Sequence, residues 1–169
     1  MTLPELARQA ISIYLESGKI IVPPAEIAAQ YRGQAGTFVS LHTKDGRLRG
    51  CIGTFSPTKE NISEEVIHNA ISAAVHDPRF HPLPLSELDE TEISVDVLSP
   101  PEPVKDIKEL DPKKYGIIIS TRDERRGLLL PDIDGVDTTD QQIDICQQKG
   151  GINSDEDYGI EKFTVTRYK

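Results

Sequence analysis

The chain has 169 residues, of which 37% are hydrophobic and 28% are charged, and its formal net charge is −9. This composition is ordinary for a folded protein, and the acidic balance disfavours nucleic acid, whose phosphates repel such a surface. The apolar runs are far shorter than the roughly 20 residues of a membrane-spanning helix, and the first residues lack the zones of a signal peptide. We therefore expect a cytoplasmic protein in which both cysteines, Cys51 and Cys146, are free thiols.

The first predicted element is a helix that starts near Thr2. Apolar residues recur at helical spacing over 3–14, Thr2 and Glu5 form a capping-box pattern, and Gly18 is a suitable stop. Residues 23–27 then predict a short second helix or a turn.

A β-hairpin is predicted next, with strands at residues 37–43 and 47–54. Asp45-Gly46 is the favoured centre of a two-residue type I′ turn. The pattern becomes helical from about residue 57 to 75, and Asp77-Pro78 ends that helix.

The second half begins with a half-buried strand at residues 93–97. A second hairpin follows, with strands at 116–121 and 127–130 and a charged, exposed turn between them. Thr138 and Gln141 resemble a capping box before a weak helix, and residues 159–168 predict a last strand. No internal repeat is visible.

These elements predict an α+β fold, because hairpins imply antiparallel pairing. We expect an antiparallel sheet built from hairpins and flanked by helices. It forms one domain over residues 1–169, either as a single body or as two lobes that share one core.

The strand Leu48-Arg49-Gly50-Cys51-Ile52-Gly53-Thr54-Phe55 resembles the signature octapeptide of the AMMECR domain family. Further matches follow in the same order, among them Asp77-Pro78-Arg79-Phe80 and Gly127-Leu128-Leu129-Leu130-Pro131, so that the resemblance covers roughly residues 3 to 131. The C-terminal part departs from the family pattern, because the chain has no Trp.

The resemblance implies the family's fold, but the family has no assigned reaction. The prokaryotic members are called AmmeMemoRadiSam system protein A. That name implies a Memo-like protein and a radical-SAM-like protein as partners. The sequence does not identify a cofactor.

The predicted hairpin also has a chemical character of its own. In the register that a two-residue turn sets, Ser40 faces Cys51, His42 faces Arg49, and one face carries Phe38, Ser40, His42, Arg49 and Cys51. The other face carries Val39, Leu41, Leu48 and Ile52, which is typical of a core. A cation near a thiol favours the thiolate, and a histidine can accept its proton. Cys51, His42 and Arg49 are therefore the candidate catalytic residues, with Ser40, Gly50 and Gly53 as candidate ligand-binding residues beside them.

Each of these residues also has an inert interpretation. A cysteine on a strand is often a small buried hydrophobe, Arg49 could pair with an acidic residue such as Asp96, and His42 could be a plain surface residue. The glycines could serve a twist or bulge, and Phe38 could cover Gly53.

The loop at residues 77–81 is the second candidate site. Arg79 could bind an anion in a pocket lined by Phe80, or Phe80 could plug the core while Arg79 pairs with Asp77. His68 and His76 are eight residues apart, too far for a simple two-histidine metal motif, so no metal site is predicted.

Two function classes remain. The first is a ligand- or partner-binding pocket at the Arg49-Gly50-Cys51 strand, with Cys51 as a thiol nucleophile or redox group. The second is an interaction module without chemistry. Nucleic-acid binding would rest only on scattered arginines and is disfavoured.

Overall fold

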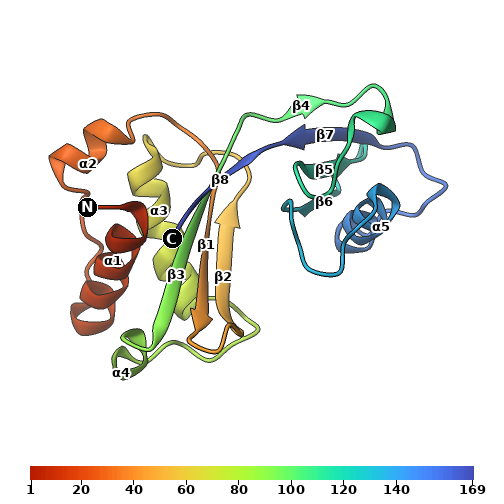
Figure 1. Cartoon of the computed structure of the whole chain (residues 1–169). Coiled ribbons are helices and arrows are strands. Elements are labelled where there is room, and N and C mark those ends of the chain that lie inside the picture. Colours follow the sequence, from red (N-terminus) through yellow and green to blue (C-terminus); the bar gives the residue numbers. More distant parts are fainter. The chain divides into compact units, whose positions relative to one another are not determined.

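The computed structural model describes residues 1–169, which form two compact units. Unit 1 comprises Met1–Leu98 and Thr166–Lys169, and unit 2 comprises Ser99–Val165. Each unit has an antiparallel sheet with its own buried hydrophobic cluster, which confirms the predicted α+β class (Figure 1). The assignment of residues 1–169 to one domain stays a prediction. None of the helices combines the length and apolar character that crossing a membrane requires.

Unit 1 is a four-stranded sheet of order β2-β1-β3-β8 with helices α1 and α3 packed on one face (Figure 1). Its elements are α1 (Leu3–Ser17), α2 (Ala25–Gln30), β1 (Thr37–Thr43), β2 (Leu48–Thr54), α3 (Ile62–Val75), α4 (Leu85–Leu88), β3 (Thr91–Leu98) and β8 (Val165–Tyr168). The predicted capping box of α1 is present, and Gly18 ends the helix in the left-handed conformation. Helix α3 starts later than expected, because Asn61 caps it by accepting a hydrogen bond from the Glu64 amide.

The β1–β2 hairpin confirms half of the predicted register. Ser40 pairs with Cys51 as expected, but His42 pairs with Leu48 rather than with Arg49. The loop has three residues, 44–46. The amide of residue 46 donates to the Thr43 carbonyl, and the Thr43 amide donates to the carbonyl of residue 47, which closes the loop. Arg49 is left without a partner on β1 and forms a bulge, which restores the predicted pairing from Gly50 onward.

The bulge also changes which side chains reach the core of unit 1. Val39 and Leu41 are fully buried and Ile52 packs against that core, as expected. Leu48 is 39% exposed, so its assignment to the core face was wrong. The loop contains one residue more than the predicted turn. The pairing near the turn is therefore shifted by one residue, which turns Leu48 to the opposite face of the sheet.

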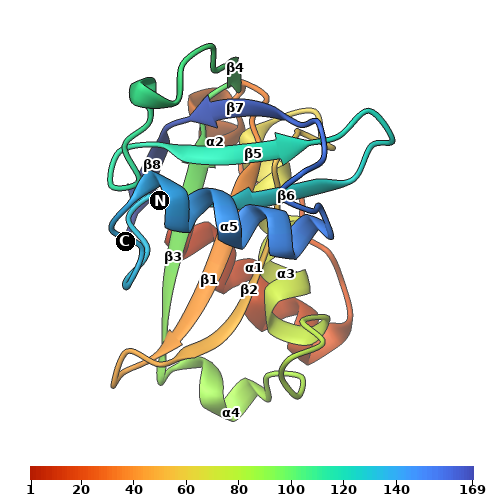
Figure 2. The same cartoon turned by 90° about the vertical axis from the view of Figure 1, so that its right-hand side faces the viewer.

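Unit 2 is a four-stranded sheet of order β4-β7-β5-β6, with α5 lying against β5 and β6 (Figure 2). Its elements are β4 (Glu102–Pro103), the 3₁₀ turn η1 (Ile107–Glu109), β5 (Gly116–Ser120), β6 (Arg126–Leu129), α5 (Thr139–Gly150) and β7 (Gly159–Phe163). The predicted capping box at Thr138 is present. The predicted last strand is in fact two strands, β7 and β8, which belong to different sheets and are separated at Thr164.

The two units share one plan that the sequence did not reveal. In each, a hairpin is followed by a helix and then by a strand that pairs antiparallel with the first strand of the hairpin. The central strand orders are β2-β1-β3 and β6-β5-β7. In each unit a glycine on the second hairpin strand lies against the backbone of the following helix: Gly50 against Ala73, and Gly127 against Cys146.

The hairpin turns of the two units also match in detail. In both, a threonine hydroxyl and an arginine Nε donate hydrogen bonds to one aspartate. In unit 1, Thr43 and Arg47 donate to Asp45. In unit 2, Thr121 and Arg125 donate to Asp123. The fourth position has a positive φ in both turns, 83° at Gly46 and 67° at Glu124. A shared Thr-x-Asp-x-Arg pattern therefore encodes the same three-residue loop twice.

Glu124→Gly is expected to stabilise the chain by about 1 kcal/mol, because only glycine adopts the left-handed region without steric cost. Gly46→Ala, the reverse change at the matching position, is expected to destabilise it by a similar amount. Urea unfolding at neutral pH measures both. Equal effects of the same sign would contradict the shared turn geometry.

Candidate functional site

The strand with the signature octapeptide is β2, which lies at the edge of the unit 1 sheet. Cys51 is half-buried on it, and the Ser40 hydroxyl on β1 donates a hydrogen bond of 3.2 Å to its sulfur. Ser40 and Cys51 are therefore cross-strand neighbours in contact, as the hairpin pattern predicted.

The surroundings of Cys51 favour the thiol over the thiolate. Burial raises the pKa of Cys51, and the hydrogen bond from Ser40 and the charge of Arg79 offset that rise only in part. The carboxylates of Asp77 and Asp96 raise the pKa further. This direction is opposite to the one that a thiol nucleophile needs.

Neither His42 nor Arg49 forms a hydrogen bond to the thiol of Cys51. The Arg49 guanidinium binds Glu87 through two hydrogen bonds, of 2.7 and 3.1 Å, and donates a third, of 3.0 Å, to the His81 carbonyl. Arg49 thus pairs with Glu87 instead of the suggested Asp96, which binds Arg167.

Asp77 is the residue that organises this part of unit 1. Its side chain is only 2% exposed, accepts the Cys51 amide at 2.9 Å, and pairs with Arg79 through bonds of 3.0 and 2.8 Å. Arg79 in turn donates to the Cys51 carbonyl at 3.2 Å. These contacts hold the pKa of Asp77 well below its usual range, chiefly through the hydrogen bonds from Arg79, so the carboxylate stays charged.

The Asp77–Arg79 pair therefore takes the place of a neighbouring strand beside Cys51. Exposed edge strands present unpaired amides and carbonyls that invite other strands. Here both backbone groups of Cys51 are occupied by side chains from the loop after α3. The local Asp77–Arg79 pair was one of the two sequence interpretations. Its bond to β2 was not foreseen, since the two segments are 26 residues apart.

Beside this pair lies a hollow of about 390 Å³. Its lining residues are Arg49, Pro78, Arg79, Phe80 and His81, so of the first candidate site only Arg49 lies at this hollow, together with the loop of the second. The Arg79 guanidinium lies 5.5 Å from the centre of the Phe80 ring, and its side chain is 56% exposed. Phe80 is half-buried and lines this hollow.

The chain itself fills the space beside Gly50 and Gly53, the two glycines of β2 that are candidate ligand-binding residues. A Cβ at Gly50 would lie 2.3 Å from the Ala73 carbonyl oxygen, and one at Gly53 would lie 2.3 Å from the Phe38 ring. Phe38 thus covers Gly53, and Gly50 allows close packing of β2 on α3. Neither glycine opens room for a ligand at its own Cα.

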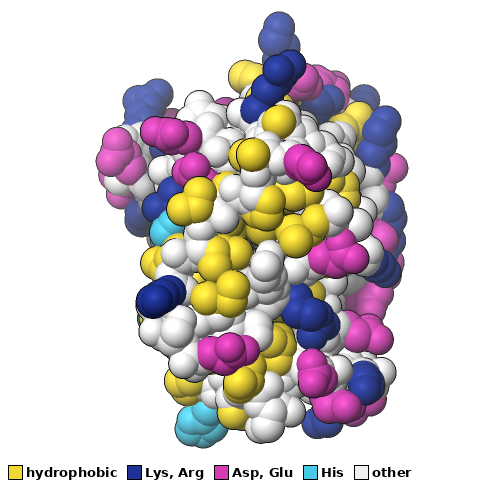
Figure 3. All heavy atoms as spheres, turned by 90° about the vertical axis from the view of Figure 1, so that its left-hand side faces the viewer, with side chains coloured by type: hydrophobic (Ala, Val, Ile, Leu, Met, Phe, Trp, Pro, Cys, Tyr) yellow, Lys and Arg dark blue, Asp and Glu magenta, His cyan; other side chains and the backbone are white.

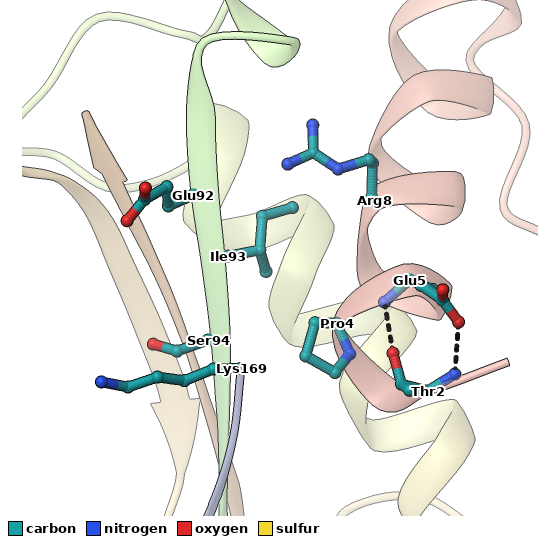
Figure 4. A pocket seen from close by; sticks show the side chains of 8 residues that line it. All are labelled: Thr2, Pro4, Glu5, Arg8, Glu92, Ile93, Ser94 and Lys169. Carbon is teal, nitrogen blue, oxygen red and sulfur yellow. Dashed lines mark hydrogen bonds between the residues drawn. The ribbon is translucent and has the colours of Figure 1, made fainter. Parts of the chain in front are cut away.

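A larger hollow, of about 490 Å³, lies in unit 1 between the start of α1 and β3 (Figure 4). The fold uses three of its polar side chains. Glu5 and Thr2 bind each other's amides in the capping box, and Arg8 donates to the carbonyls of Leu88 and Thr91. Glu92, Ser94 and Lys169 also line this hollow, and their side chains form no hydrogen bond within the chain.

Hydrophobic side chains also gather on the face that carries α1 and α2 (Figure 3). Between these helices Ile20 is 51% exposed and Val22 is 84% exposed. Nothing in the structure indicates what would cover them. No group of three or more His, Cys, Asp or Glu side chains is placed to hold a metal ion.

Comparison with known proteins gives consistent matches. The AMMECR1 family model matches residues 4–169. A protein of Thermotoga maritima is 53% identical over 165 residues, covering 96% of this chain and 94% of that protein. Protein CA_C1420 of Clostridium acetobutylicum is 48% identical over 167 residues, covering 98% of this chain but 35% of that protein. The crystal structure of an uncharacterized protein, PH0010 from Pyrococcus horikoshii, superposes with a TM-score of 0.89 at 34% identity, covering 98% of this chain and 88% of that one.

Proposed function

This chain belongs to the AMMECR1 family, and from that premise we propose that it is a binding module rather than an enzyme. Its binding site is the hollow beside β2 that Arg49, Pro78, Arg79, Phe80 and His81 line. Residues 1–169 act as one functional domain. The module works in the cytoplasm, where Cys51 and Cys146 stay reduced.

The observation that carries this proposal is that Arg79, although exposed, is held in one conformation by Asp77. Long arginine side chains lose considerable conformational entropy when they are fixed. Here the buried Asp77 carboxylate has fixed the guanidinium in advance, above the ring of Phe80. Arginine and aromatic side chains dominate the energetics of protein interfaces, and preorganisation removes part of the cost of binding.

The loop is held from its other side as well. Arg49 donates to the His81 carbonyl, and the Leu83 amide bonds the Ala74 carbonyl at the end of α3. Arg49 is therefore a positioning residue, since all three of its guanidinium nitrogens donate to Glu87 or to the loop. The surface at residues 78–81 is thus a fixed shape, as a recognition site requires.

The proposed partners are a Memo-like protein and a radical-SAM-like protein, as the family resemblance implies. In Clostridium acetobutylicum the matching region is 35% of a longer chain, which supports a module that works together with other polypeptides.

Thiol chemistry at Cys51 is the competing function. The Ser40 hydrogen bond and the nearby Arg79 favour it, but burial raises the pKa of Cys51 overall. Alkylation of the thiol across pH separates the two functions. We expect slow alkylation whose midpoint lies above that of an ordinary free cysteine. A midpoint below it would support a catalytic thiol.

The binding function predicts that Phe80→Ala weakens association with the Memo-like or radical-SAM-like protein of the same organism at least about tenfold, because it removes the aromatic wall of the hollow. Cys51→Ser and Arg122→Ala, the latter on the exposed hairpin tip of unit 2, are expected to bind like the wild type. Titration calorimetry gives the affinities. Loss of binding only in Cys51→Ser would reverse the proposal in favour of the thiol.

A further inference from the structure

We infer that the hollow beside β2 recognises a carboxylate on an acidic peptide segment of a partner protein, and that Arg79 is the residue that contacts it. This inference rests on the proposed function and names the chemistry of its ligand.

The hydrogen-bond donors of Arg79 leave one edge of the guanidinium free. Nε and Nη2 bind Asp77, and Nη2 also donates to the Cys51 carbonyl. No protein group accepts from Nη1, which carries two N–H groups. Because Asp77 fixes the plane of the group, these two donors point in a set direction and suit an anionic oxygen.

The charges around the hollow favour one anionic group of limited size. Two arginines and a histidine line it, and no acidic residue does. The carboxylates that pair with these arginines, Asp77 and Glu87, are each bound by two guanidinium hydrogen bonds. A single carboxylate therefore finds no unpaired acidic side chain lining the hollow. A polyanion such as nucleic acid would extend beyond the hollow and be repelled by a chain whose net charge is −9.

The other walls of the hollow are apolar. Pro78 and Phe80 offer a surface that suits the apolar residue next to an acidic one in a peptide. A volume of about 390 Å³ accommodates a few side chains. Because Arg79 is 56% exposed, the carboxylate is reached from the protein surface, as in a protein interface.

The test is an NMR titration of ¹⁵N-labelled protein with the peptide acetyl-Phe-Asp-Phe-amide and with its Asn counterpart. We expect the acidic peptide to shift the amide signals of residues 78–81 and to bind about tenfold more tightly than the Asn peptide, since a charge-assisted hydrogen bond is lost in the latter. Benzoate supplies the small-acid arm and is expected to bind more weakly than the acidic peptide.

Two variants and a control variant complete the design. Arg79→Gln is expected to abolish the preference for the acidic peptide. Because that change also deprives Asp77 of its cation, Phe80→Ala is the second variant: it keeps the Asp77–Arg79 pair and is expected to weaken both peptides while the preference remains. Arg122→Gln, in unit 2, is expected to behave as the wild type.

Three outcomes would overturn the inference. Equal binding of the two peptides at residues 78–81 would refute carboxylate recognition yet leave the proposed function intact. Benzoate binding as tightly as the acidic peptide would make the ligand a small acid. Absence of any shift at residues 78–81 would refute the peptide site. The proposed function would fail as well only if Phe80→Ala also left the affinity for the partner proteins unchanged.

Discussion

Replacing Gly50 with alanine is expected to destabilise unit 1 by about 3 kcal/mol. The new Cβ would lie 2.3 Å from the Ala73 carbonyl oxygen and 3.2 Å from its carbonyl carbon. Both are backbone atoms of α3, so the strand or the whole helix must move. Urea unfolding followed by circular dichroism measures the loss, and NMR spectra show which unit is affected.

The chain supplies matched controls for that experiment. Gly159→Ala is expected to change stability by less than about 0.5 kcal/mol, because nothing lies within 4 Å of the added Cβ. Gly127→Ala is expected to damage unit 2 at least as much as Gly50→Ala damages unit 1, since its Cβ would lie 1.7 Å from the Cys146 carbonyl oxygen. If Gly50→Ala unfolded like the wild type, the close approach of β2 to the α3 backbone would not constrain this position.

The hairpin shows how far sequence reasoning reaches. Asp45-Gly46 correctly marked the turn, but its type depends on whether Thr43 and Arg47 close a longer loop through Asp45. The three-residue loop adds one residue to the turn, and the bulge at Arg49 absorbs it. The predicted Ser40–Cys51 pair is therefore right although the turn that was used to derive it is wrong.

The candidate site was predictable as a set of segments but not as a set of contacts. The octapeptide and residues 77–81 were both singled out, yet Arg49 was assigned to the thiol and instead binds Glu87, 38 residues away. Such a pairing depends on where the loop after α3 lies relative to β2. Local sequence patterns do not determine that position.

The common plan of the two units was invisible for a related reason. Their hairpins share only a turn pattern and one glycine, Gly50 or Gly127, each of which meets a helix backbone. The bulge at Arg49 further offsets the spacing between turn and glycine in unit 1. The two units thus share their topology although few of their side chains match in sequence.

Glu65 on α3 is a second residue whose importance only the structure reveals. The residue is 1% exposed, and its carboxylate forms no ion pair with a basic side chain. It accepts hydrogen bonds from the Thr54 and Thr58 hydroxyls, at 2.6 and 2.9 Å, and from the amides of Thr58 and Lys59, at 2.7 and 2.8 Å. One side chain thus anchors the loop that leaves the end of β2.

Glu65→Ala is expected to lower the free energy of unfolding at pH 7 by about 3 kcal/mol or more, because it leaves two backbone amides and two hydroxyls without their acceptor. Urea unfolding measures the change. Glu64→Gln is the matched control: this neighbouring side chain accepts only from the Asn61 amide group and should shift stability by less than about 0.5 kcal/mol.

The charge of Glu65 also sets the direction of a pH effect. Burial raises its pKa, but the hydrogen bonds from Thr54, Thr58 and Lys59 together outweigh burial and bring it below the ordinary glutamate value. A pKa that is lower in the folded than in the unfolded chain contributes stability above the unfolded value, near 4.3, and that contribution is lost as pH falls through the folded value. The stability difference between the wild type and Glu65→Gln should therefore be constant at neutral pH and shrink below about pH 4. A difference that grew on acidification would mean that the buried carboxyl is already protonated in the folded chain.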